Sequence, residues 1–336
     1  MVANSVGRSS SFRHASKLLQ RAAATPVSVL LQGETGVGKE IFAKGLHLAS
    51  ARAAKPFIAV NCACIPPDLI EAELFGVEKG AFTGATQSRE GKFERAHGGT
   101  LFLDEVVELT PRAQAALLRV LQEGELERVG GSEVRKVDVR VVAASHENLA
   151  EAVKVGRFRA DLFYRLNVYP VHIPALRERK EDIPLLVEHF LGKYQTFYSK
   201  RTSGVTDKAM HALLEYNWPG NIRELENMVE RGVILTDNNQ PIDLAALFPS
   251  LTEPSHPLNL INANGQLKRV APAPEPGNDP LCESLLDGEF SLEQLEGRLL
   301  RAAMAKAEGN VAKAARILGL SRAQLAYRLE KLNAGS

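Results

Sequence analysis

Residues 27–40 read VSVLLQGETGVGKE, an apolar run followed at once by a glycine-rich turn and a lysine. The apolar run predicts a buried strand, and the segment that begins at the lysine predicts a helix. In this context glycines let backbone N–H groups curl around phosphate oxygens, and the helix N-terminus adds its positive dipole. We therefore expect a phosphate loop that binds nucleotide through Gly33, Glu34, Thr35, Gly36, Val37, Gly38, Lys39 and Glu40.

Within this loop, Lys39 is expected to reach the β- and γ-phosphate oxygens. The next position, normally a Ser or Thr that binds magnesium, is Glu40. A glycine-rich turn without a ligand is the alternative, but both the spacing and the placement fit a phosphate loop.

Outward from this loop, apolar runs alternate with helical patterns. Strands are expected at 27–32, 57–61, 100–104, 137–145 and 168–172, with helices at 39–50, 66–75 and 111–123. Such alternation implies an α/β fold, in which a parallel sheet is covered on both faces.

Four parts follow along the chain. We expect an α/β nucleotide-binding part at 1–175, a helical lid at 176–248, a flexible linker at 249–290 and an all-α DNA-binding part at 291–336. The linker holds seven of the seventeen prolines and has too little apolar periodicity to pack.

Composition narrows the class of protein. Apolar residues make up 45% and charged residues 24% of the 336, typical of a globular protein with a real core. We find neither a long uncharged apolar run nor a signal-peptide pattern, so we expect a cytoplasmic protein with no membrane partner. Cys62, Cys64 and Cys282 are odd in number and lack metal-ligand spacing, which favours reduced, buried thiols.

Charge is unevenly distributed along the chain. The net charge is +1, but residues 291–336 carry eight basic against four acidic side chains, a net of +4. A basic end is the part of the chain in which to expect nucleic-acid binding.

A second motif, Leu101-Phe102-Leu103-Asp104-Glu105, is an apolar strand that ends in two carboxylates. Burying an unpaired charge costs free energy. Two carboxylates at the end of a buried strand therefore indicate a function for them. Beside a phosphate loop, Asp104 would hold Mg²⁺ and Glu105 would polarise the water that attacks the γ-phosphate. Two solvated acids at a strand end are the alternative.

Two arginines, Arg159 and Arg165, lie six residues apart in the segment 156–166. If that segment is a helix at a subunit edge, both arginines can reach a neighbouring subunit's nucleotide. The alternative is a surface ion pair within the chain, for which Asp161 is the obvious partner.

The sequence GAFTGA at residues 80–85 places Phe82 and Thr83 between two glycines. Soluble proteins usually avoid an exposed aromatic, so this pattern indicates a loop that contacts a partner, unless the Phe tucks under the surface.

Near the C-terminus, Ala315, Gly319 and Leu325 have the spacing of a helix-turn-helix. Asn310 is expected to cap the first helix and Ser321 the second. The second helix then presents Ser321, Arg322, Gln324 and Arg328 toward DNA, and a preceding helix at 291–307 would pair two such units. A plain helical hairpin is the alternative.

The motifs GETGVGKE, GAFTGA, GGTLFLDEV, FRADLFYRLN, LRERKEDIP and WPGNIRELEN occur here in this order. Over about residues 5–248 the chain resembles the central AAA+ domain of bacterial enhancer-binding proteins that activate sigma-54 RNA polymerase, and its end resembles a Fis-type DNA-binding domain.

The resemblance implies ATP and Mg²⁺ as cofactors, a homo-oligomer ranging from a dimer to a hexameric ring, and sigma-54 RNA polymerase holoenzyme and enhancer DNA as partners. It also implies residue roles: Asn61 restrains Glu105, Arg159 and Arg165 act in trans as arginine fingers, and Arg223 senses nucleotide from the lid. Phe82 and Thr83 would touch sigma-54. The first sensor position, often an Asn, is Ser145-His146 here.

Such activators usually carry an N-terminal regulatory domain, so we expect a shortened or a naturally unregulated form. The motif versions are most similar to those of activators that respond to phenols. The alternatives are a nitrogen- or other-signal-responsive activator of the same family, an AAA+ protein unfoldase, and a nucleotide-gated DNA-binding repressor.

Overall fold

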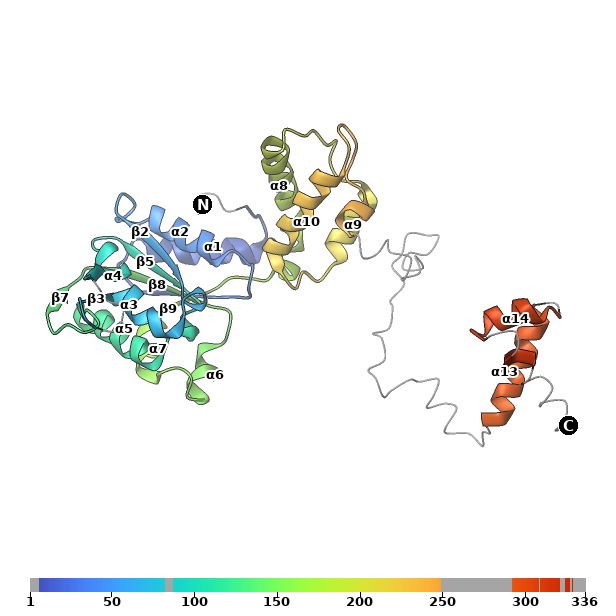
Figure 1. The fold of residues 1–336 in the computed structure, drawn as a ribbon. Coiled ribbons are helices and arrows are strands. Elements are labelled where there is room, and N and C mark those ends of the chain that lie inside the picture. The colour runs from blue at the N-terminus through green and yellow to red at the C-terminus, as the bar shows by residue number, and fades with distance from the viewer. Residues whose placement is uncertain are drawn as a thin grey trace. The chain divides into compact units, whose positions relative to one another are not determined.

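The computed structural model describes residues 6–81, 87–248, 292–307, 309–320, 324–326 and 328. These residues fall into two compact units, of which the first ends at Phe248 and the second begins at Leu292 (Figure 1).

The first unit contains a five-stranded parallel sheet in the order β2-β5-β8-β1-β9. Its strands are β1 (Val29–Gln32), β2 (Phe57–Asn61), β5 (Thr100–Asp104), β8 (Arg140–Ser145) and β9 (Tyr169–His172). The α/β class and all five expected strands are therefore confirmed, with β1, β8 and β9 starting one to three residues later than expected. β8 starts late because the backbone N–H of Val137 is bonded to the Gly124 carbonyl outside the sheet.

Helices and short 3₁₀ turns connect these strands (Figure 1). They are α1 (Ser10–Ala23), α2 (Lys39–Leu48), η1 (Cys62–Cys64), α3 (Pro67–Phe75), α4 (Lys92–Arg95), η2 (Val106–Glu108), α5 (Pro111–Glu123), α6 (Leu149–Lys154) and α7 (Ala160–Leu166). Side-chain hydrogen bonds cap the N-termini of several helices. The Ser9 side chain accepts from the Phe12 N–H at the start of α1. The Thr110 side chain accepts from the Ala113 N–H at the start of α5, where Pro111 is the first helical residue.

Two antiparallel hairpins project from this framework. One pairs β3 (Gly76–Val77) with β4 (Arg89–Glu90), and the other pairs β6 (Glu125–Glu127) with β7 (Val134–Lys136).

The core lies on both faces of the sheet because side chains alternate along each buried strand. Leu101 and Leu103 pack on one face with Phe93, while Phe102 packs on the other with Phe42. Cys62 is a free, buried thiol, as expected. Cys64 is also free but exposed, and Cys282 lies outside the described residues.

After β9 the chain becomes helical. The elements are η3 (Leu176–Glu178), η4 (Lys180–Asp182), α8 (Ile183–Phe197), α9 (Asp207–Glu215), α10 (Asn221–Leu235) and α11 (Leu244–Leu247). Trp218, fully buried, fixes the turn before α10 by donating its indole N–H to the Leu213 carbonyl.

The second unit contains α13 (Leu292–Lys306) and α14 (Val311–Ile317). Its small core consists of buried alanines and leucines, among them Ala303, Ala314, Ala315 and Leu325.

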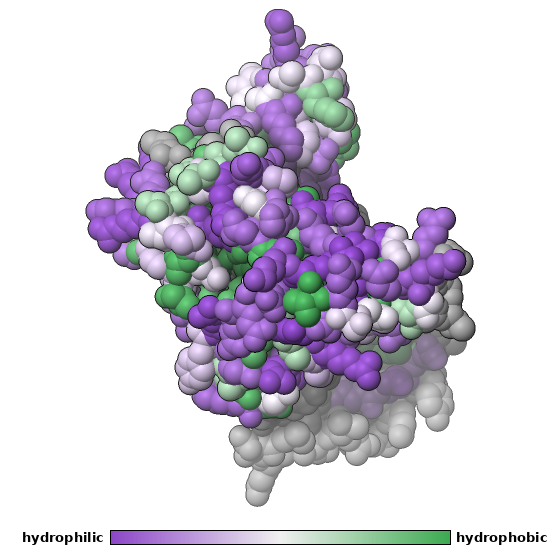
Figure 2. Space-filling view, turned by 90° about the vertical axis from the view of Figure 1, so that its left-hand side faces the viewer, coloured by the Kyte–Doolittle hydropathy of each residue, from purple (hydrophilic) through white to green (hydrophobic). Residues whose placement is uncertain are grey.

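Several large hydrophobic residues are exposed, among them Val155, Tyr164 and Phe197. Figure 2 shows a face in which hydrophilic residues dominate and apolar ones lie between them. Among the described helices, none is both long and apolar enough to cross a membrane.

Candidate nucleotide site and DNA-binding unit

The phosphate loop connects β1 to α2, as the sequence predicts. Gly36 and Gly38 have φ values of +82° and +95°, which side-chain-bearing residues rarely adopt. Across residues 34–38 no backbone N–H donates a hydrogen bond to another described residue. Free N–H groups at a helix start form a cradle for anionic oxygen atoms, so the loop fits a nucleotide phosphate.

Lys39 lies at the start of α2 and is almost fully buried. Its Nζ donates to the Gly33 carbonyl at 3.0 Å and lies 3.3 Å from Oε1 of Glu105. This ammonium is therefore held at the mouth of the cradle by groups that a phosphate can replace.

Asp104 ends β5, one residue before Glu105. Burial raises the pKa of Asp104 above its usual range, although the charge of Lys39 opposes this shift. Among the described residues there is no cluster of three or more metal-ligating side chains. One carboxylate together with substrate phosphates is a common donor set for Mg²⁺, so Asp104 fits that role.

Glu105 adopts a left-handed backbone conformation, with φ of +53°, and its side chain is 12% exposed. Burial alone would raise the pKa of Glu105, but the hydrogen bond from His146 and the charge of Lys39 outweigh it and hold this pKa below its usual range. Glu105 is thus an ionised acceptor beside the phosphate loop, as a general base requires.

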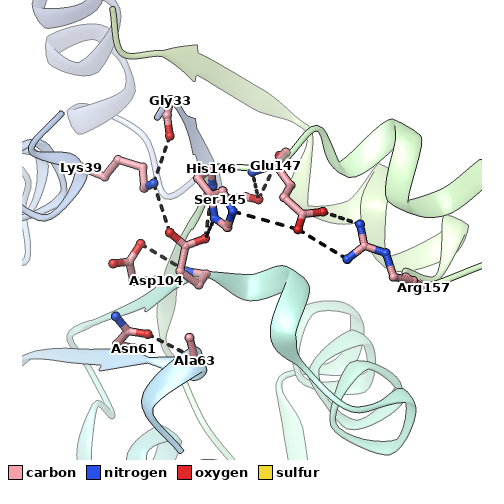
Figure 3. Close-up of polar contacts among 10 residues, drawn as sticks. Gly33, Lys39, Asn61, Ala63, Asp104, Ser145, His146, Glu147 and Arg157 are labelled. Carbon is pink, nitrogen blue, oxygen red and sulfur yellow. Dashed lines mark hydrogen bonds and ion pairs between the residues drawn. The ribbon is translucent and has the colours of Figure 1, made fainter. Parts of the chain in front are cut away.

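His146 hydrogen-bonds the Glu105 carboxylate. Oε2 of Glu105 accepts hydrogen bonds from Nδ1 of His146 at 2.6 Å and from its backbone N–H at 3.2 Å (Figure 3). Asn61 instead caps the following 3₁₀ turn, because its Oδ1 accepts from the Ala63 N–H at 3.0 Å. No hydrogen bond joins Asn61 to Glu105 here, so a restraint of Glu105 by Asn61 stays a prediction.

The lid contacts the phosphate loop through the first turn of α10. The backbone N–H groups of Ile222 and Arg223 donate to the Gly36 carbonyl at 3.0 and 3.4 Å. A Cβ at Gly36 would lie 2.3 Å from the Gly220 carbonyl, so the approach needs a glycine. The structure places Arg223, the expected lid sensor, directly beside the loop.

Asn221 joins the lid, the loop and the connecting segment. It is fully buried with φ of +52°, and its amide donates to Glu34 at 3.1 Å and to the Thr35 carbonyl at 3.0 Å, while its Oδ1 accepts from the Leu176 N–H at 2.8 Å. A strained, buried residue with three hydrogen bonds fixes the lid on the loop. Neither Asn221 nor this contact was anticipated, although Asn221 lies inside the WPGNIRELEN motif.

Glu34 is the charged member of this junction. It forms a bidentate ion pair with Arg177 and accepts from Asn221, and these hydrogen bonds lower its pKa to about 2. A folded-state pKa below the unfolded value means that the carboxylate stabilises the fold above the unfolded pKa, near 4.5.

We therefore expect Glu34→Gln to lower the free energy of unfolding at neutral pH and to lose that deficit as pH falls from about 5 toward about 2. Because the side chain is 43% exposed, the effect should be on the order of 1 kcal/mol or less. Urea denaturation of wild type and variant across this range measures it. A deficit that does not change with pH would mean that the Glu34 charge is not the source.

An apolar pocket adjoins the phosphate loop. It is lined by Val6, Phe12, Val37, Gly38, Ile41, Phe42, Arg179, Leu186, His189, Phe190 and Ile222. Arg179 is buried there, with its guanidinium 5.7 Å from the Phe12 ring centre and its Nε without a hydrogen-bond partner. An apolar wall with a polar group beside a phosphate cradle fits a nucleotide base. The motifs GETGVGKE, LRERKEDIP and WPGNIRELEN contribute Val37, Arg179 and Ile222 to this pocket, but no sequence pattern predicted it.

The two candidate finger arginines lie at α7 and contact their own subunit. Arg159 precedes the helix and ion-pairs with Asp161 at 2.7 Å, which is the alternative that the sequence left open. Arg165 donates from Nε and Nη2 to the Leu121 carbonyl at 3.1 and 2.7 Å. Both bonds lie on the exposed surface, where another partner can compete for the arginines.

Of the GAFTGA motif, only Gly80 and Ala81 are described, and Phe82 and Thr83 lie outside the described residues. Gly80 has φ of +86° and open space around it, consistent with a turn.

The second unit has several features of a helix-turn-helix. Gly319 has φ of +66° in the turn after α14, Leu325 is fully buried, and Asn310 caps α14 by accepting from the Lys313 N–H at 3.1 Å. Gln324 is exposed, and Arg328 ion-pairs with Glu296 of α13 at 2.5 Å. Ser321 and Arg322 lie outside the described residues.

Three parts of the chain match known families. Residues 5–172 match the sigma-54 interaction domain, residues 177–260 the AAA+ ATPase lid domain, and residues 291–332 the Fis family of bacterial regulatory proteins.

Individual relatives of this chain are transcriptional regulators as well. The chain is 59% identical over 333 residues to the phenol regulator MopR of Acinetobacter guillouiae and 58% identical over 328 residues to the transcriptional regulatory protein XylR of Pseudomonas putida. These matches cover 99% and 98% of this chain but 57% of each relative, so the chain spans little more than half their length.

The transcriptional regulatory protein ZraR of Escherichia coli is 42% identical, with 97% of this chain and 68% of ZraR covered. Among solved structures, NtrX of Brucella abortus in complex with ADP has a TM-score of 0.70 at 34% identity, with 99% of this chain and 69% of that chain covered. The same protein in complex with ATP also has a TM-score of 0.70. The chain belongs to the sigma-54-dependent transcriptional activators, with an AAA+ domain followed by a Fis-type helix-turn-helix.

Proposed function

We propose that this chain hydrolyses ATP to remodel sigma-54 RNA polymerase at promoters while its C-terminal unit binds upstream DNA. The observation that carries the proposal is the meeting of Lys39, Asp104 and Glu105 beside an open phosphate cradle. The relationship to NtrX, solved with ADP and with ATP, supports adenine nucleotide as the ligand.

In this proposal the N–H groups of the loop and the Lys39 ammonium bind the β- and γ-phosphates. Asp104 would hold Mg²⁺, which would supply positive charge to neutralise the phosphates. Glu105 accepts the proton of the attacking water. Arg223, beside Gly36, reports the phosphate state to the lid.

We also propose that subunits assemble, as a dimer or a hexameric ring, so that Arg159 and Arg165 complete a neighbour's site. The exposed position of their bonds to Asp161 and Leu121 supports this, since both bonds can be exchanged for phosphate contacts.

If sites are shared, mixing Arg165→Ala subunits with Lys39→Ala subunits should recover ATPase activity that neither variant has alone. Each mixed interface can combine an intact phosphate loop with an intact finger. ATPase rate against mixing ratio measures this, with oligomer size as the control, because Arg165 also bonds its own subunit. No recovery at any ratio between variants that still assemble would contradict a shared site.

The C-terminal unit is proposed to bind enhancer DNA through the helix that contains Gln324 and Arg328. The net charge of +4 over residues 291–336 supports this role. Arg328 would exchange its exposed ion pair with Glu296 for a phosphate.

Deleting residues 291–336 is expected to abolish enhancer binding while ATPase activity persists. In the intact chain, affinity should fall at least about tenfold between about 50 and about 200 mM salt, because phosphate contacts release counterions. Gel-shift titrations at several salt concentrations test both statements. Unchanged affinity in the deleted chain would place DNA binding elsewhere.

The kinship with the phenol regulator MopR supports a role in controlling genes of aromatic-compound catabolism, in the cytoplasm where the polymerase acts.

Open-complex formation tests the proposal. Purified chain, sigma-54 holoenzyme and a promoter with its enhancer should give open complexes with ATP and none with a non-hydrolysable analogue. An unfoldase would hydrolyse ATP without opening the promoter, and a nucleotide-gated repressor would bind DNA without needing hydrolysis.

A further inference from the structure

The Glu105 carboxylate is held from two sides. Its Oε1 faces Lys39 at 3.3 Å, and its Oε2 faces two donors of one residue, the Nδ1 and the backbone N–H of His146 (Figure 3). A carboxylate accepts hydrogen bonds, so Nδ1 of His146 must carry the hydrogen. Two donors from one residue fix the direction of Oε2 as well as its distance.

His146 is itself well supported. It follows directly after Ser145, the last residue of β8, so the sheet sets its backbone position. The turn is closed by Ser145, whose Oγ accepts from the Glu147 N–H at 3.1 Å and donates to the Glu147 carbonyl at 2.9 Å. Glu147 in turn ion-pairs with Arg157 (Figure 3).

Nucleotide binding is expected to affect the contacts of Oε1 and Oε2 of Glu105 differently. If Lys39 turns to phosphate, as in the proposed function on which this inference rests, Oε1 of Glu105 loses its partner. The bonds to Oε2 involve no group of the phosphate loop, so nothing in that loop competes for them. Asn61 makes no hydrogen bond to Glu105 here, and its Oδ1 accepts from the Ala63 N–H.

We propose that His146 is a positioning residue, which keeps Glu105 oriented through Oε2 so that Oε1, released by Lys39, faces the attacking water.

A matched pair of substitutions tests this assignment. In His146→Asn the amide nitrogen takes the place of Nδ1 and can still donate to Oε2, whereas His146→Asp has the same shape but no donor. Because a misplaced group costs up to about a hundredfold, we expect kcat to fall about tenfold to a hundredfold in His146→Asp and to stay within about threefold of wild type in His146→Asn. Substitution of the exposed His211 by Asn serves as the control.

Binding of a non-hydrolysable ATP analogue is measured on the same assembled preparations and is expected to change by less than about threefold in both variants. Equal kcat values for the Asn and Asp variants would overturn the inference, as would a loss of analogue binding parallel to the loss of kcat, since His146 would then act on the nucleotide itself. A wild-type chain without ATPase activity overturns the proposed function, and this inference with it.

Discussion

Replacing Glu105 with Gln is expected to reduce ATP turnover by at least about a hundredfold, the scale of removing a positioned general base, while ATP binding persists. The amide keeps the shape of the side chain but cannot accept a proton from water. Binding should persist because the phosphate contacts come from the loop and from Lys39, which is freed of an ion pair at 3.3 Å.

Steady-state ATPase rates and equilibrium binding of a fluorescent ATP analogue measure the two effects separately. Glu108→Gln is the matched control, since Glu108 is an exposed carboxylate three residues further along the same turn. Near-normal turnover in the Glu105 variant would contradict the assignment of Glu105 as the general base.

Local sequence patterns predicted the parts of this site that lie within one short segment. The phosphate loop and the β5 carboxylates each occupy a few consecutive residues, and in a parallel sheet their strand ends necessarily meet at one edge. The buried strands were found for the same reason, because continuous apolar runs mark them. The β6–β7 hairpin was not predicted, since β7 is short, charged and largely exposed.

Contacts between distant segments were not accessible from one sequence. His146 reaches Glu105 across 41 positions, and Asn221 reaches Glu34 across 187. Whether Asn61 or His146 meets Glu105 depends on the geometry of two strand ends, which residue types alone do not specify. The pocket that contains Arg179 likewise forms only when α1, α2, α8 and α10 come together.

The chain just before the GAFTGA segment, which we call its base, is anchored to the rest of the domain. On its N-terminal side, the Glu78 N–H donates to the Val129 carbonyl, and Arg128 pairs with both Glu78 and Glu94. Arg128 and Glu94 are 9% and 11% exposed, so the pair that they form is largely shielded from solvent. This pair positions Arg128, which in turn holds the more exposed Glu78. A change at position 83, beyond this base, should not disturb it.

We therefore expect Thr83→Ala to abolish promoter opening while ATPase rate and ring assembly remain near wild type. The residues proposed to carry hydrolysis lie in the phosphate loop and at the end of β5, and position 83 belongs to neither segment of the sequence. Thr83→Ser keeps the hydroxyl and should retain part of the opening activity. ATPase rate, oligomer size and open-complex yield are measured on one preparation of each variant. Survival of open-complex formation in Thr83→Ala would show that the hydroxyl is not the contact to sigma-54, and a parallel collapse of ATPase activity would show that the loop is coupled into the catalytic site.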